Sequence, residues 1–235
     1  NNAIDFLDKY RENLSDKNWR LFIQESHTIK ICHDKWNLWK FMKQEGFSSP
    51  KTFLLAESDP PDIFPLILKE RKGEGGKNQS VIENQRDLDY CMGRYSKHIF
   101  QEFIQGKEFS IDLFADINGV PKLVVPRERL SVRGGEVMTS RIEMNNSIIV
   151  AVEKLSRKLG LTGPCNIQGI QDKNGQFFFT DLNLRFGSGS IHTIAAGGNI
   201  PMMICQEMTG QQLLNPVIKD QSIMTRYPEN IFRHS

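Results

Sequence analysis

The sequence predicts an α+β protein built largely from antiparallel sheet. Two strand patterns flank Asn118-Gly119, and two more flank the segment 172–175, Asp-Lys-Asn-Gly. Turn sequences of this kind between apolar segments are typical of β-hairpins. Helical patterns stand between the hairpins rather than after every strand, and this order is typical of the α+β class.

The composition is that of a globular protein. The 235 residues leave room for one large or two small domains, and 39% of them are hydrophobic while 25% are charged. A net charge of +2 argues against a nucleic-acid partner. No apolar run approaches the ~20 residues of a membrane span, and no signal-peptide pattern is present, so we expect a cytoplasmic protein with no membrane partner. The scattered cysteines, expected as reduced thiols, are Cys32, Cys91, Cys165 and Cys205.

The first clear helix follows about thirty polar residues that have no strong pattern. Asp34 is a suitable N-cap, and Trp36, Trp39 and Met42 recur at helical spacing before Gly46 ends the segment. A second helix is expected from Asn84 to Tyr95. Short apolar segments expected as strands are 52–55, 64–69 and 99–104.

The second half holds the hairpins and the longest helical pattern. Strands are expected at 109–114 and 121–125, and again at 167–171 and 176–182. Between them, residues 146–159 carry an apolar stripe that ends at Gly160. A last helix is expected over 202–208, after Pro201. The stripe of the longest helix consists of Ile148, Val152, Leu155 and Leu159.

A glycine-rich loop follows the strand that ends at Lys69. It reads Gly73-Glu74-Gly75-Gly76, and its glycines let backbone N–H groups approach a phosphate closely. It is not a Walker A loop, because no Gly-Lys-Ser/Thr sequence follows. A basic surface turn without a ligand is the alternative.

The segment 181–187 combines residue types that suit Mg²⁺ and phosphate. On a strand, Asp181, Asn183 and Arg185 share one face because side chains alternate. Gln168, across the hairpin, supplies a further oxygen. Mg²⁺ prefers oxygen ligands, and a guanidinium neutralises charge on a transferred phosphoryl group. A solvated polar strand face is the alternative.

A third segment, 101–108, reads Gln-Glu-Phe-Ile-Gln-Gly-Lys-Glu. A strand that ends in a turn presents a backbone C=O beside an N–H, and this pair can read the edge of adenine. Glu108 can accept hydrogen bonds from ribose hydroxyls. An edge strand without a ligand is the alternative.

Taken together and in this order, these motifs resemble the ATP-grasp superfamily. The resemblance is strongest to the large subunit of carbamoyl-phosphate synthase and the related carboxylate–amine ligases, and it runs from Asp34 to Gly210. Each motif is unspecific alone, but the ordered set is specific. The segments that carry it are 34–35, 66–69 with the glycine loop, 101–108, 166–168 and 181–185.

The resemblance implies a fold of two antiparallel-sheet α+β subdomains that clamp the nucleotide. The ATP-grasp domain would span 34–210, with a lid subdomain at about 50–100 and a C-terminal subdomain at about 101–210. Residues 1–33 would be a tail or linker from an N-terminal Rossmann-like domain that is missing here, and 211–235 a C-terminal extension.

The resemblance also implies roles for individual residues. Lys35 and Lys69 would hold the α- and β-phosphates of ATP, under a lid loop containing Gly73, Gly75 and Gly76. The nucleoside would be bound by Gln101, Glu102, Phe103, Ile104 and, at the ribose, Glu108. Gln168, Asp181 and Asn183 would face Mg²⁺, with Mn²⁺ as the alternative ion. Arg185 would face the γ-phosphate or acyl phosphate, and Arg129 an anionic substrate.

The implied activity is that of an ATP-dependent ligase. ATP would convert a carboxylate, or bicarbonate, into an acyl phosphate that an amine or similar nucleophile attacks. The small-molecule carboxylate and amine are the expected partners, and a homodimer is left open. Asp181 stands where the family usually has Glu, and Leu184 where it usually has Pro. These departures keep a second reading open, a non-catalytic or regulatory ATP-binding module.

Overall fold

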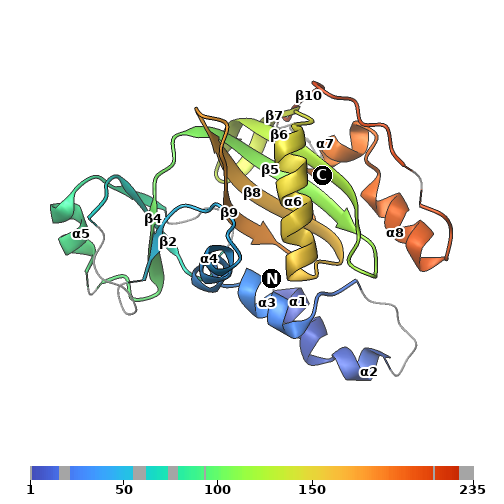
Figure 1. Ribbon diagram of the computed structural model, residues 1–235, viewed down its shortest axis with the longest axis horizontal. Helices are drawn as coiled ribbons and strands as arrows, with labels where there is room; N and C mark the ends of the chain where they lie inside the picture. The colour runs from blue at the N-terminus through green and yellow to red at the C-terminus, as the bar shows by residue number, and fades with distance from the viewer. Residues whose placement is uncertain are drawn as a thin grey trace, which may run out of the picture.

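The chain folds around two antiparallel sheets, as the α+β prediction requires (Figure 1). The computed structural model describes residues 2–15, 22–54, 62–73, 79–92, 94–213 and 215–227. The smaller sheet has the strand order β1-β4-β2-β3, and the larger has the order β10-β7-β6-β5-β8-β9. The smaller sheet lies beside the β8–β9 side of the larger one (Figure 1).

One face of the smaller sheet packs against a short helix. Its core contains Leu66, Phe100 and, from the helix, Leu88. Asn84 caps this helix by accepting a hydrogen bond from the Asp87 N–H. The helix ends at Cys91, four residues before the predicted end, because Met92 already adopts extended backbone angles. The elements are β1 (Thr52–Phe53), β2 (Leu66–Glu70), β3 (Ser80–Ile82), α5 (Gln85–Cys91) and β4 (His98–Glu102).

The larger sheet is a series of hairpins, and both predicted hairpins are confirmed. The turns contain glycines with positive φ, including Gly119 at 75° and Gly175 at 82°, a conformation that glycine adopts without steric cost. The strands are β5 (Gly106–Ala115), β6 (Pro121–Arg133), β7 (Glu136–Ile142), β8 (Gly163–Asp172), β9 (Phe177–Asn183) and β10 (Ile223–Thr225).

Helix α6 (Asn146–Leu159) lies along one face of the larger sheet (Figure 1). Its predicted apolar stripe is buried in the main core together with the strand residues Phe109, Ile111 and Ile167. Asn145 caps the helix, and Gly160 ends it in the left-handed conformation. The opposite face of the same sheet is divided: one part packs Phe114, Leu123 and Val125 against residues 196–203 in a second apolar cluster, and another part carries polar side chains.

The N-terminal residues form helices that the sequence pattern did not reveal. These are α1 (Asn2–Lys9), α2 (Arg11–Ser15) and α3 (Ser26–Cys32), followed by the predicted α4 (Lys35–Gln44). Ile29 and Cys32 of α3 belong to the main core, and the Thr28 hydroxyl donates to the Leu159 carbonyl at 2.8 Å. The α3 segment is therefore packed onto the domain. The origin of residues 1–33 in another domain stays a prediction.

Two helices follow the sheet, α7 (Ser190–Ala195) and α8 (Ile200–Met208). The second was predicted, and Pro201 stands in its first turn; α7 was not predicted. No helix in the described part of the chain is long and apolar enough to cross a membrane.

A β-bulge interrupts the β8–β9 ladder. Gln168 pairs with Asp181, but its neighbour Gly169 pairs with Phe179, so Thr180 is an extra residue in β9. Phe177 and Phe179 therefore lie in the main core, while Asp181 lies on the opposite face. If the same residues formed a regular strand without a bulge, the side chains of 177, 179 and 181 would all share one face.

Candidate active site

A cleft of about 1020 Å³ lies between the two sheets. Its walls are the smaller sheet, the loop after β2, the polar face of the larger sheet and the hairpin of β6 and β7. Every predicted site residue that the structure describes lines it, whereas Gly75 and Gly76 lie outside the described residues. The predicted residues in the cleft are Lys35, Lys69, Gly73, Gln101, Glu102, Phe103, Ile104, Glu108, Arg129, Gln168, Asp181, Asn183 and Arg185.

Strand register assembles the polar face. Gln168 of β8 pairs with Asp181 of β9, and two positions along, Asn166 pairs with Asn183. On the other side of β8, Asn166 pairs with Asp112 of β5. Directly paired residues point to the same side of a sheet, so a row of carboxylates and amides runs across three strands.

The first lysine of the site is fixed by a helix cap. Asp34 accepts hydrogen bonds from the N–H groups of Trp36 and Asn37, and its carboxylate also accepts from the Arg71 Nε at 2.8 Å. The Lys35 N–H donates to the Arg71 carbonyl at 3.1 Å. Helix α4 is thereby attached to the end of β2, where the glycine loop begins.

The Lys35 ammonium reaches across the cleft. Its Nζ donates to the Gly73 carbonyl at 2.6 Å and lies 4.0 Å from the Asp181 Oδ1. One side chain thus contacts both the glycine loop and the larger sheet.

The second lysine is buried among neutral acceptors. The Lys69 Nζ donates to the Gln101 Oε1 at 2.7 Å, and the Gln101 amide donates to the Thr52 hydroxyl at 2.9 Å. The Thr180 carbonyl, from the bulge, lies 3.5 Å from the same ammonium. Burial lowers the pKa of Lys69 to about 8; Asp181 opposes this shift and Lys35 adds to it. A desolvated cation of this kind favours an anion such as phosphate beside it.

Arg129 lies on the far side of the cleft, on β6. Its Nη1 is 3.4 Å from the Glu108 Oε2, and its Nη2 donates to the Gly135 carbonyl at 3.3 Å. Its Nε is buried and has no hydrogen-bond partner among the described residues. Burial lowers the pKa of Arg129. Arg129 therefore connects the turn between β6 and β7 to Glu108, the residue predicted to bind the ribose.

The predicted metal set fits a hard cation in its chemistry. Gln168, Asp181 and Asn183 offer one carboxylate and two amide oxygens on adjacent positions of one sheet face. The described residues contain no group of three His, Cys, Asp or Glu side chains placed to hold a metal ion. Oxygen ligands from phosphate would therefore have to complete the coordination of Mg²⁺, as is usual for this ion.

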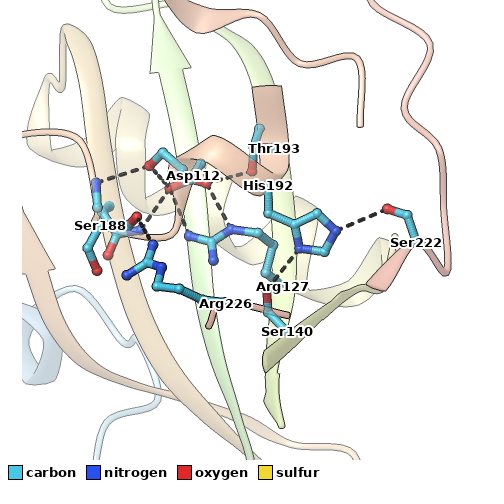
Figure 2. A network of polar contacts seen from close by, with 11 residues as sticks. Asp112, Arg127, Ser140, Ser188, His192, Thr193, Ser222 and Arg226 are labelled. Carbon is cyan, nitrogen blue, oxygen red and sulfur yellow. Dashed lines mark hydrogen bonds and ion pairs between the residues drawn. The ribbon is translucent and has the colours of Figure 1, made fainter. Parts of the chain in front are cut away.

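Sequence reasoning missed the most deeply buried charges of the cleft wall, Asp112 and Arg127 (Figure 2). Each is 1% exposed, and the Arg127 Nε donates to the Asp112 Oδ2 at 2.9 Å. A signal was present, since Asp112 interrupts an apolar strand between Ile111 and Leu113.

Comparison with known proteins identifies the family. Residues 32–189 match the model of the ATP-grasp domain. The chain is 24% identical over 148 residues to carbamoyl-phosphate synthase of Methanobrevibacter smithii, covering 61% of this chain and 35% of that protein. It is 25% identical over 201 residues to the carbamoyl phosphate synthase large chain of Caldanaerobacter subterraneus subsp. tengcongensis, covering 75% of this chain and 18% of that protein.

Solved structures share the fold. A biotin carboxylase from Campylobacter jejuni superposes with a TM-score of 0.75 at 18% identity, covering 94% of this chain and 57% of that one. The chain spans a fifth to a third of the length of the two synthases it matches. The family match covers most of the chain and includes both sheets up to the loop after β9. The chain belongs to the ATP-grasp family.

Proposed function

We propose that the chain is the nucleotide-binding part of an ATP- and Mg²⁺-dependent ligase. It would activate a carboxylate, or bicarbonate, as an acyl phosphate for attack by an amine or similar nucleophile. The observation that carries the proposal is the convergence of two lysines on one acid. Lys35 from α4 and Lys69 from β2 both face Asp181 of the other sheet across the cleft.

The nucleotide would lie along the junction of the sheets. Its phosphates would replace part of the solvent around Lys35 and Lys69, and the Gly73 loop would close over them. The base would lie against residues 102–104, where the Phe103 ring is 45% exposed. Glu108 would accept from the ribose hydroxyls. The lid, about 50–100, would exclude water that hydrolyses an acyl phosphate.

The reaction would proceed in two steps. A carboxylate oxygen would attack the γ-phosphorus, the bond to the β-phosphate oxygen would break, and ADP would leave the acyl phosphate. The amine would then attack the carbonyl carbon and release phosphate, while its proton passes to solvent. Arg185 would neutralise charge on the phosphoryl group in the first step, and Arg129 would hold an anionic part of the acceptor.

Three side chains would hold the metal ion, namely Gln168, Asp181 and Asn183. Bound there with phosphate oxygens, Mg²⁺ would supply charge neutralisation and Lewis acidity at the phosphates. Mn²⁺ as a substitute and a homodimeric state both stay predictions, as does a cytoplasmic location.

The relatives of the chain support this class of reaction. They include carbamoyl phosphate synthases and a D-alanine–D-alanine ligase from Fervidobacterium nodosum, which is 24% identical over 216 residues. Similar structures include an N5-carboxyaminoimidazole ribonucleotide synthetase in complex with ADP. Because these substrates differ from one another, the acceptor and nucleophile of this chain have to be found by experiment.

The first experiment is thermal melting with and without Mg²⁺ and ATP. A ligand that binds only the native state stabilises it by about 2.7 kcal/mol at a hundred times its Kd. We expect a rise of several degrees that needs both Mg²⁺ and ATP in wild type and in Lys173→Ala, an exposed turn variant. The rise should vanish in the double variant Asp181→Ala, Asn183→Ala. A full rise in the double variant would show that the metal assignment is wrong.

The second candidate function is a regulatory module that binds ATP without turnover. The single carboxylate of the metal set favours it, because a longer Glu would bridge two ions more readily. ADP formation would be followed in the presence of carboxylic acids and amines, using the longest available form of the protein. Tight nucleotide binding with no acceptor-dependent ADP formation would favour the module over the ligase.

A further inference from the structure

The wall of the cleft beyond Arg185 is a segment held by one buried ion pair. Residues 187–193 run from the end of β9 into α7, and Gly187, Ser188 and Gly189 line the cleft. Beneath them lie Asp112 and Arg127, which are both 1% exposed. Figure 2 shows the contacts converging on the Asp112 carboxylate.

Asp112 binds the segment at two points. The Ser190 hydroxyl donates to its Oδ1 at 2.7 Å, and the Thr193 hydroxyl donates to its Oδ2 at 2.6 Å. Ser190 Oγ in turn accepts from the Gly187 N–H at 3.0 Å. The backbone of the segment is thus tied to the carboxylate through a chain of hydrogen bonds.

Two further side chains orient the carboxylate itself. The Arg127 Nε and Nη2 donate to its two oxygens at 2.9 Å and 3.3 Å, and the Asn166 amide donates to Oδ1 at 2.8 Å. Arg127 and Asn166 come from the strands on either side of Asp112, so the carboxylate has a fixed direction. A buried charge held by several bonds is costly to move, because any lost partner leaves a desolvated group.

The glycines of the segment fit closely over this network. A Cβ at Gly189 would lie 2.4 Å from the Arg127 Nη1, and a Cβ at Gly187 would lie 2.7 Å from the Asn166 Nδ2. Only a residue without a side chain allows the backbone this approach. From the outer side, the Arg226 guanidinium donates to the Ser188 carbonyl at 2.7 Å.

We infer that Asp112 and Arg127 are positioning residues that fix segment 187–193 and, through it, the place of Arg185 at the phosphoryl end of the cleft. The inference rests on the proposed function for the role of Arg185. The anchoring itself rests only on the contacts described. Arg127 contributes to the lining of the cleft, but each side chain is only 1% exposed, so neither residue is expected to bind the nucleotide directly.

The test uses Asp112→Asn, which keeps the shape and removes the charge. Hydrogen exchange would be followed in peptides that cover 185–193 and in peptides from β8. The matched control is Asp116→Asn, the same change at a 6% exposed aspartate at the far end of β5, which accepts from the N–H groups of Asn118 and Val120. We expect exchange at 185–193 to quicken about tenfold in Asp112→Asn alone, with β8 unchanged.

A binding measurement reports on Arg185. With Mg²⁺ present, Asp112→Asn should bind ADP within about threefold of wild type, since Lys35 and Lys69 lie on other elements. Its preference for a non-hydrolysable ATP analogue over ADP should fall about tenfold, as in Arg185→Ala. Asp116→Asn should keep the wild-type preference. A general loss of stability would lower the affinity for both nucleotides equally, and the ratio of the two affinities would not change.

A second variant keeps the inference testable if Asp112→Asn does not fold. Gly189→Ala should also quicken exchange at 185–193. The added effect of Gly189→Ala should be smaller in an Arg127→Lys background than in the wild type, because lysine lacks the Nη1 atom that the new methyl group meets. Unchanged or uniformly raised exchange, or a retained ATP preference in Asp112→Asn, overturns the inference. Absence of nucleotide binding by the wild type overturns the proposed function and the role assigned through Arg185. The hydrogen-exchange measurement still tests whether Asp112 and Arg127 anchor segment 187–193.

Discussion

The ammonium of Lys69 is paired with the neutral side-chain carbonyl of Gln101, at 2.7 Å, rather than with a carboxylate. The lysine is 7% exposed, so neither water nor a formal negative charge compensates it fully. This is the arrangement expected of a site in which the compensating charge arrives with a ligand.

Nucleotide affinity should depend on the charge of Lys69. Its pKa of about 8 means that the free protein loses this charge as the pH rises above 8. A bound phosphate favours the charged form, so binding above pH 8 requires proton uptake and weakens by up to about tenfold per pH unit. Titration of Mg²⁺ and ADP between pH 7.5 and 9.5 measures this slope. Lys69→Arg keeps its charge and should show little slope, and an equally flat wild type would contradict the assignment.

The cap at Asp34 should matter more than an ordinary helix cap. Asp34→Ala removes two capping hydrogen bonds and leaves Arg71 without its carboxylate, and we expect a cost of about 2–3 kcal/mol. Asn145→Ala removes a cap of similar geometry from α6 without breaking an ion pair, and should cost about 1 kcal/mol. Urea denaturation measures both.

The two caps differ in a second respect. Asp34→Ala should also weaken binding of Mg²⁺ and ADP, because Lys35 is the first residue of the helix. Asn145→Ala should not, because Asn145 lies outside the cleft. If the two variants lost the same free energy of unfolding and bound nucleotide equally well, the contact between Asp34 and Arg71 would have no special role.

Gly169 should be intolerant of any side chain. A Cβ there would lie 2.2 Å from the Phe177 Cζ and 2.6 Å from the Phe178 carbonyl, so Gly169→Ala should cost about 3 kcal/mol. Gly175, in the turn of the same hairpin, has a φ of 82° but open space around it. Gly175→Ala should therefore cost only about 1 kcal/mol of backbone strain. Chemical denaturation of the two variants distinguishes crowding from strain, and the reverse order would refute the crowding.

Thiol labelling should single out one cysteine. Cys32, Cys91 and Cys165 are buried, and burial raises the pKa of each thiol, to about 12 for Cys165. Cys205 is exposed. We expect iodoacetamide to modify Cys205 in the native protein at pH 8, and the others only in denaturant. Mass spectrometry of tryptic peptides locates the label, and native labelling of Cys165 would contradict its burial.

The sequence predicted those elements whose signals are local. The hairpin of β8 and β9 was predicted from Asn174-Gly175, and alternation then brought Gln168 opposite Asp181, as the register confirms. By contrast, α3 and α7 have no side-chain cap, and β3 and β10 are short edge strands without a buried alternation. These elements depend on tertiary packing, which one sequence does not reveal.

The same division applies to the site. Lys35, Lys69 and Asp181 stand in recognisable motifs, and the structure brings them into one cleft. The pairing of Asp112 with Arg127 depends on the register between β5 and β6, where Asp112 pairs with Val125, two residues from the arginine. No local pattern encodes that register, because Arg127 stands in the charged run Arg-Glu-Arg at 127–129, where nothing in the sequence distinguishes it as the partner of Asp112.

The extra residue of β9 also marks the point at which the odd-numbered side chains of the strand change from one face of the sheet to the other. Up to Phe179 the odd-numbered side chains belong to the core, and from Asp181 onward they belong to the cleft, while Leu182 and Leu184 take over the core positions. Deleting Thr180 would restore regular pairing and still leave Asp181 on the cleft face, because Asp181 would then follow Phe179 directly in an alternating strand. The deletion would instead remove the carbonyl that lies 3.5 Å from the Lys69 ammonium. The extra residue is therefore a source of a backbone acceptor for the lysine, rather than a requirement for the direction of the carboxylate.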